Sequence, residues 1–139
     1  MNCEDRCRAE VADLHRFFQE WFRGELPDTD EAYARFAGVM GEPFEMVSPE
    51  GQAIDRAVIL KIVREGHGKE PAADIWIENH RHRFTIGAIS MVTYEEWQDW
   101  GGQRRGRLST AVFRTDEAAP NGVHWLHVHE TWLPESEAD

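Results

Sequence analysis

Residues 74–132 read DIWIENHRHRFTIGAISMVTYEEWQDWGGQRRGRLSTAVFRTDEAAPNGVHWLHVHETW, and this segment decides the fold of the chain. Four stretches within it are rich in β-branched and aromatic residues, namely 75–78, 89–97, 108–113 and 125–132. Residues that favour turns, mainly Gly, Pro and Asn, separate these stretches. Strands that follow one another through short connections pair antiparallel, so the segment predicts a four-stranded meander.

The preceding half of the chain has the periodicity of helices. Over residues 4–23, apolar side chains recur at spacings of three and four, which predicts an amphipathic helix. Two further helices are expected over about 28–40 and 55–66, separated by a short hairpin strand and turn at 44–51. Helices followed by strands are typical of the α+β class, in which the helices cover one face of the sheet.

The composition limits the classes of partner. The chain has 139 residues, with 15 Lys and Arg against 26 Asp and Glu, and a formal net charge of −11. Nucleic acid and an anionic membrane surface are excluded as partners, because both require a basic face. The length fits one domain, expected over residues 1–134, followed by a polar tail over 135–139.

The compartment is also an expectation from the sequence. No apolar run approaches the length of a membrane span, and the first residues lack the apolar region of a signal peptide. We therefore expect a cytoplasmic protein. The excess of arginine over lysine points to a bacterial source with a GC-rich genome.

The order of the elements and four motifs resemble the nuclear transport factor 2-like, or SnoaL-like, superfamily. The motifs are FEMVSPEG at 44–51, MVTY at 91–94, RLSTAVF at 107–113 and WLHVHET at 125–131. The last motif is also similar to the ending of the calcium/calmodulin-dependent kinase association domain. The resemblance implies a cone of three N-terminal helices packed on a curved, mostly antiparallel sheet, with a pocket inside and a homodimer formed through the sheet.

Candidate ligand-binding residues lie on the last strands, where successive side chains alternate between the two faces. Arg107 and Ser109 share one face of their strand, and His127 and His129 share one face of theirs. If both faces look into the pocket, Arg107 pairs with Glu95 and His129 lies close by, which suits a small organic ligand. The opposite parity, with the even-numbered side chains of the last strand facing inward, stays open.

Three functions are compatible with this interpretation. The leading hypothesis is a homodimeric protein that binds a small organic molecule inside the cone. One alternative is an isomerase, dehydratase or cyclase that uses His129 as a general base. The other alternative is an oligomerisation module without catalysis, because members of one fold family carry many unrelated functions.

Two histidine pairs have the spacing of half a metal site. His80 and His82 form one pair, and His127 and His129 form the other. A zinc site needs at least a third protein ligand, and arginines that would repel a cation flank the first pair. We therefore expect neither a metal nor a cofactor.

Overall fold

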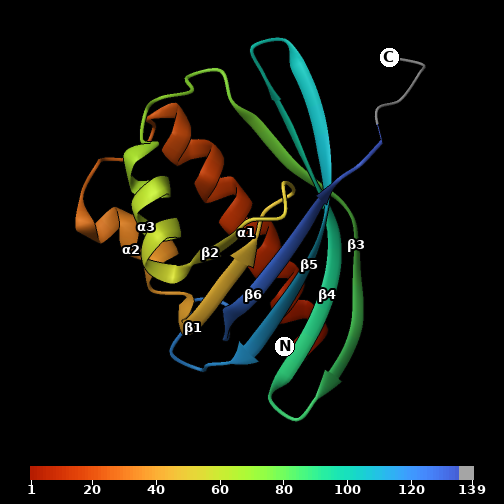
Figure 1. Cartoon of the computed structure of the whole chain (residues 1–139). Helices are drawn as coiled ribbons and strands as arrows, with labels where there is room; N and C mark the ends of the chain where they lie inside the picture. Colours follow the sequence, from red (N-terminus) through yellow and green to blue (C-terminus); the bar gives the residue numbers. More distant parts are fainter. Residues whose placement is uncertain (135–139) are drawn as a thin grey trace.

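The computed structural model describes residues 1–134, in which three helices lie on one side of a six-stranded sheet (Figure 1). The predicted polar tail, residues 135–139, lies outside the described residues. The helices are α1 (Cys3–Arg23), α2 (Asp30–Ala37) and α3 (Arg56–Glu65). The strands are β1 (Met40–Val47), β2 (Ala53–Asp55), β3 (Asp74–Ile86), β4 (Ile89–Trp100), β5 (Gln103–Thr115) and β6 (Val123–Trp132). The predicted α+β fold of three N-terminal helices on a curved, mostly antiparallel sheet is confirmed.

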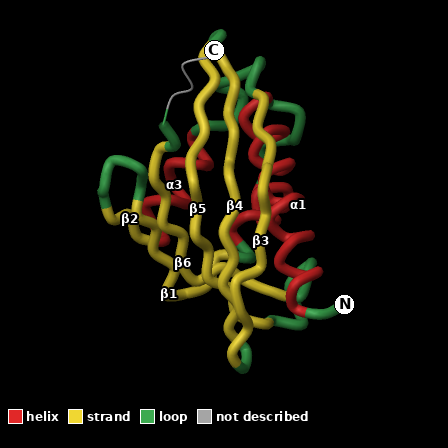
Figure 2. The backbone as a smooth tube through the Cα atoms, turned by 90° about the vertical axis from the view of Figure 1, so that its right-hand side faces the viewer, coloured by secondary structure: helices red, strands yellow, loops and turns green. Residues whose placement is uncertain are grey.

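The strands are arranged in the order β2-β1-β6-β5-β4-β3, and Figure 2 shows them side by side in front of the helices. The predicted meander is confirmed, because β3, β4, β5 and β6 pair antiparallel in succession. β1 joins this meander by running parallel to β6. The β1–β2 hairpin therefore lies beside the end of β6 that carries the polar side chains described below.

The helix boundaries follow from their caps. Asn2 accepts a hydrogen bond from the backbone N–H of Asp5 at the start of α1, and Gly24 ends α1 with a left-handed φ of 78°. Thr29 caps α2, so the second helix begins at Asp30, two residues later than the expected start at about residue 28. It also ends earlier than expected, because Met40 is already part of β1.

A β-bulge in β6 decides which side chains face the helices. Val112 lies opposite His127, whereas the next residue, Phe113, lies opposite Trp125. Leu126 is therefore an extra residue in β6, and such an insertion reverses the alternation beyond it. Trp125, Val128 and Glu130 are all buried on the inner face, although a regular strand would place Trp125 on the opposite face from the other two.

A buried carboxylate ties the helices to the sheet. Glu10 of α1 has no exposed surface and accepts hydrogen bonds from Arg35 of α2 and from the indole N–H of Trp125. It also accepts one from the amide of Asn121, just before β6. A buried charge needs such partners, and here they fix α1 across the inner face of the sheet. Among residues 1–134, no helix combines the length and apolar character required to cross a membrane.

Candidate functional site

A pocket of about 150 Å³ lies between α1 and the inner face of the sheet. Its wall is largely aromatic and aliphatic, and its polar residues gather on one side. The wall includes Phe18, Phe22, Phe36, Met40, Phe44, Met46, Ile59, Val63 and Trp125. The polar group consists of His15, Glu96, Gln98, Arg107 and Glu130, which we call the polar floor.

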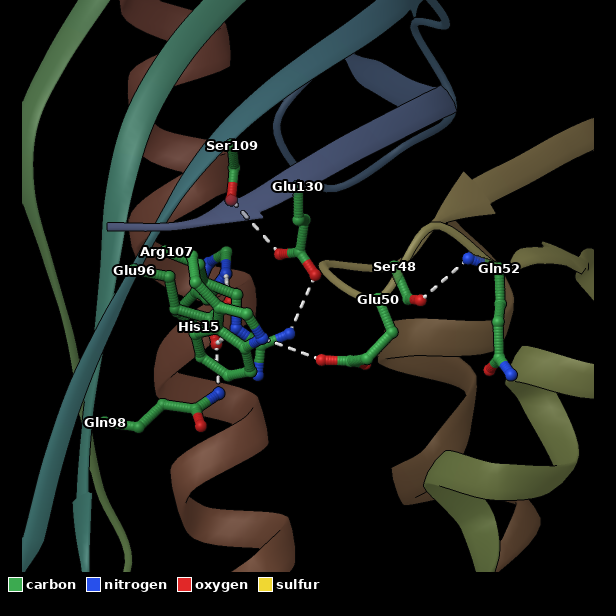
Figure 3. A network of polar contacts seen from close by, with 10 residues as sticks. His15, Ser48, Glu50, Gln52, Glu96, Gln98, Arg107, Ser109 and Glu130 are labelled. Carbon is green, nitrogen blue, oxygen red and sulfur yellow. Dashed lines mark hydrogen bonds and ion pairs between the residues drawn. The ribbon is translucent and has the colours of Figure 1, made fainter. Parts of the chain in front are cut away.

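Arg107 contacts both carboxylates of the polar floor (Figure 3). Its Nη1 donates to Oε1 of Glu130 over 2.7 Å, and its Nε lies 3.4 Å from Oε2 of Glu96. These three residues come from β5, β6 and β4. Glu96 lies directly opposite Arg107, and Glu130 lies opposite Ser109, two residues further along β5, so all three share one face. The buried Nε has no hydrogen-bond partner within residues 1–134. Arg107 therefore forms a hydrogen-bonded ion pair with Glu130, and an ion pair without a hydrogen bond with Glu96.

His15 brings a second cationic group from α1. Its Nδ1 lies 2.7 Å from the carbonyl oxygen of Val11, which can only accept, so this nitrogen carries a hydrogen. Its Nε2 lies 2.8 Å from Oε1 of Glu96. Burial lowers the pKa of His15, but the hydrogen bond and negative charge of Glu96 outweigh burial and raise the pKa above its ordinary value. The geometry thus favours an imidazolium that donates from both nitrogens.

The two carboxylates of the polar floor differ in their affinity for a proton. Burial raises the pKa of Glu96, yet the charges of Arg107 and His15 lower it well below its ordinary value. Burial and the nearby charge of Glu96 raise the pKa of Glu130, and Arg107 offsets only part of this effect. Two carboxylates near one guanidinium behave in this way because the first to ionise disfavours the second.

Polar contacts continue beyond the floor. The hydroxyl of Ser109 donates to Oε2 of Glu130 over 3.1 Å, so Ser109 orients this carboxylate from a fully buried position. The indole N–H of Trp132 donates to Glu50 over 2.7 Å, and the ring lies 5.2 Å from the guanidinium carbon of Arg107. Glu50 belongs to the β1–β2 turn, which Figure 3 shows beside the polar floor.

The structure places the predicted site residues in two groups. Arg107 and Ser109 face inward, and Arg107 lines the pocket. His127 and His129 do not line it, since the bulge at Leu126 turns them to the outer face of the sheet. The expectation that they look into the cone is wrong.

Glu95 was expected to pair with Arg107, and this expectation is also wrong. Glu95 lies on the outer face, where it accepts a hydrogen bond from the indole N–H of Trp97 over 3.0 Å. Arg107 contacts the next residue, Glu96, instead. Tyr94, Glu96 and Gln98 alternate along β4, and this pattern indicates that Glu96, not Glu95, shares the inner face with Tyr94. No local pattern indicated Glu130 or His15.

The histidine pair on the outer face does not complete a metal site. The rings of His127 and His129 are 6.4 Å apart between centroids. In the part of the chain that the structure describes, no group of three His, Cys, Asp or Glu side chains is arranged to hold a metal ion.

The family comparison concerns nearly the whole chain. A model of the family described as "Sucrose-6-phosphate phosphohydrolase C-terminal" matches residues 7–134. Sucrose-phosphatase 2 of Nicotiana tabacum is 26% identical over 128 residues, which cover 89% of this chain and 30% of that protein. The chain thus spans about a third of the length of the curated relatives that it matches.

Solved structures confirm the resemblance to the nuclear transport factor 2-like fold. An NTF2-like protein of unknown function from Pseudomonas aeruginosa superposes with a TM-score of 0.83, at 25% identity, and covers 93% of this chain and 99% of its own. A putative calcium/calmodulin-dependent protein kinase type II association domain from Thiobacillus denitrificans has a TM-score of 0.57 at 17% identity, covering 76% of this chain and 96% of its own. The second likeness shows the fold alone.

These comparisons correct the expected function. The chain was expected to be an otherwise uncharacterised homodimer that binds an unspecified organic molecule. That expectation is wrong, because the family match and the curated relatives both concern sucrose phosphatases. They favour neither the enzyme with His129 as base nor the oligomerisation module without catalysis.

Proposed function

The chain belongs to the family of sucrose-6-phosphate phosphohydrolase C-terminal domains, and from this premise we propose that it acts in sucrose 6-phosphate hydrolysis by recognising the sugar. The observation that carries this proposal is the polar floor, with Glu96, Gln98, Arg107 and Glu130 side by side in a pocket with an aromatic wall. Carboxylates accept hydrogen bonds from sugar hydroxyls, and the guanidinium and amide donate to them.

The charges of the polar floor favour the sugar over the phosphate. Arg107 and His15 are balanced by Glu96 and Glu130, and Glu50 adds a further carboxylate nearby. A phosphate group in the pocket would therefore lie near carboxylates as well as near the guanidinium, and its repulsion by the carboxylates costs free energy. A neutral hydroxyl group can pair with either kind of group without this repulsion.

The volume of the pocket fits one ring of the disaccharide and not both. A cavity of about 150 Å³ lined by apolar residues accepts benzene in an engineered protein, so the pocket here matches one six-membered ring. The apolar C–H face of a pyranose ring would pack against aromatic side chains such as Phe18 and Trp125. The second ring and the phosphate would then lie outside the pocket.

The cleavage of the phosphoester is assigned to residues outside this chain. The curated relatives are about three times as long as the segment that they share with it. We therefore place the chain beside a phosphatase domain, in the same polypeptide or as a separate subunit. In this role the chain raises the affinity for sucrose 6-phosphate or holds the sucrose product.

The proposal is tested by calorimetric titration of the chain with sucrose and with sucrose 6-phosphate. Glu130→Gln keeps the size of the side chain and is expected to weaken sucrose binding about tenfold, equal to about 1.4 kcal/mol. The matched control is His129→Gln, since His129 is exposed on the outer face. Absence of sucrose binding, or equal weakening by the two variants, contradicts the proposal.

We further propose that the chain self-associates through the outer face of the sheet. Leu108 lies on this face in the middle of β5 and is 40% exposed, and Phe84 of β3 is 42% exposed on the same face. Sedimentation velocity is expected to show a dimer that Leu108→Lys dissociates. Ile62→Lys on α3, where Ile62 is 53% exposed, is the control and should leave the dimer intact. A monomer at every concentration contradicts this proposal.

A further inference from the structure

An exposed arginine lies at the edge of the pocket, beyond the polar floor. Arg105 precedes Arg107 by two residues on β5, so both lie on the inner face of the sheet, about 7 Å apart along the strand. Arg105 also lies directly opposite Gln98 of β4, which lines the pocket. Its guanidinium is therefore within reach of a chemical group that extends from the pocket along β5.

The guanidinium of Arg105 contacts an aromatic ring and is not paired with a carboxylate. Its central carbon lies over the ring of Trp132, at 3.6 Å from the ring centre, and the same ring lies 5.2 Å from the guanidinium carbon of Arg107. Within residues 1–134, Arg105 forms no ion pair, whereas Arg107 is paired with two carboxylates. A negatively charged group of a ligand would thus meet an uncompensated cation at Arg105 and a compensated one at Arg107.

The contact with Trp132 orients Arg105 without using its hydrogen-bond donors. The N–H groups of a guanidinium point outward in its own plane, so a ring that packs on the flat face leaves them free. The ring of Trp132 is itself held, because its indole N–H donates to Glu50 over 2.7 Å. A planar guanidinium binds two oxygens of a phosphate at once, and an oriented one loses less side-chain entropy on binding.

We propose that Arg105 binds the phosphate of a phosphorylated disaccharide, and that the chain therefore prefers sucrose 6-phosphate to sucrose. This inference rests on the proposed function, in which one sugar ring occupies the pocket and the second ring and the phosphate lie outside it. In that arrangement the phosphate is away from the two carboxylates of the polar floor and contacts the unpaired guanidinium at the edge. The polar floor then recognises the sugar, and Arg105 recognises the phosphate.

Glu50 limits the strength of the phosphate contact. Its carboxylate is bonded to the same Trp132 ring, so it repels a phosphate at Arg105, but it is exposed and water and salt screen this repulsion. Contacts between exposed charges are weak, so the expected preference for the phosphorylated sugar is only about fivefold. Glu50→Gln removes the negative charge but keeps an oxygen that can accept from the indole, and should increase the preference.

The test is calorimetric titration of the chain with sucrose and with sucrose 6-phosphate at one ionic strength. The unsubstituted chain should bind sucrose 6-phosphate about fivefold more tightly, and Arg105→Gln should make the two dissociation constants equal. The matched control is Arg104→Gln. Arg104 is the neighbouring arginine and also lies over tryptophan rings, but it is on the outer face of the sheet, so its substitution should keep the fivefold preference.

The outcomes separate this inference from the proposed function. If the chain binds sucrose but shows no preference for the phosphate, or keeps the preference in Arg105→Gln, the inference is overturned and the proposed function is not. If neither sugar binds, both are overturned. Inorganic phosphate should compete far more weakly than sucrose 6-phosphate, and equal competition would overturn the inference, because the anion would then bind without the sugar.

Discussion

Arg107 on β5 and Glu130 on β6 face each other across the polar floor, with 2.7 Å between Nη1 and Oε1. The same guanidinium lies 3.4 Å from Glu96 on β4. The side chains of Glu130 and Glu96 are only 4% and 9% exposed, so water compensates their charges little. The stability of three neighbouring strands and the chemistry of the pocket therefore depend on Arg107, with His15 as the second cationic group beside Glu96.

Substitution of this cation should destabilise the fold. Arg107→Met keeps an unbranched apolar stem but removes the charge and leaves two buried carboxylates near each other, which should cost about 3–5 kcal/mol. Urea denaturation measures the loss. Arg105→Met is the control, since Arg105 is exposed and makes a cation–π pair with the ring of Trp132, at 3.6 Å from its centre. It should cost less than about 1 kcal/mol. Similar losses for the two variants would contradict this assignment.

The pairing of His15 with Glu96 should make stability depend on pH near neutrality. The pKa of His15 is raised in the folded chain, above an unfolded value of about 6.5. The folded state then holds more protons above pH 6.5, so the free energy of unfolding falls as pH rises through the folded pKa. Denaturation at a series of pH values upward from the unfolded pKa of about 6.5 should show this decline in the unsubstituted chain. If His15→Leu shows the same slope, another group is responsible.

Glu10 should be the most costly carboxylate to replace on α1. Glu10→Met removes the acceptor for Arg35, Asn121 and Trp125, and leaves the buried indole N–H of Trp125 without a partner. The expected loss is about 2–4 kcal/mol, measured by thermal or urea unfolding. Glu4→Met in the exposed first turn of the same helix should cost only about 0.3–1 kcal/mol. A small loss at Glu10 would show that α1 docks mainly through its apolar residues.

A side chain at Gly106 should destabilise the fold, because the ring of Trp97 packs directly on this glycine. A Cβ at this position would lie 2.7 Å from the Trp97 ring, closer than real contacts allow. Gly106→Ala should therefore cost about 1–3 kcal/mol, because the indole must move away from its stacking partner Trp76. In the background of Trp97→Ala the same substitution should cost much less, and urea denaturation of the four proteins measures this coupling. Additive costs would rule out the contact as the cause.

Local patterns were sufficient for most of the fold. The apolar stripe of α1 and the alternating strands of the meander are periodic over short stretches, so each is readable without knowledge of the partner element. The inward position of Arg107 and Ser109 follows from the same alternation. The length, the net charge and the order of the helices and strands were likewise available from the sequence without the structure.

The composition of the polar floor was decided by contacts between distant residues. The bulge at Leu126 shifts β6 by one residue relative to β5, so Glu130 faces the pocket and His127 and His129 face away. A one-residue change of register transfers every later side chain to the other face, and nothing in residues 123–132 alone marks its position. His15 and Glu96 are 81 positions apart in the sequence, and they come into contact only because α1 docks on the inner face of the sheet. The sequence by itself determined the helices and strands and their order. Only the tertiary structure decided which charged groups share one low-dielectric pocket, because their positions depend on strand register and on helix docking.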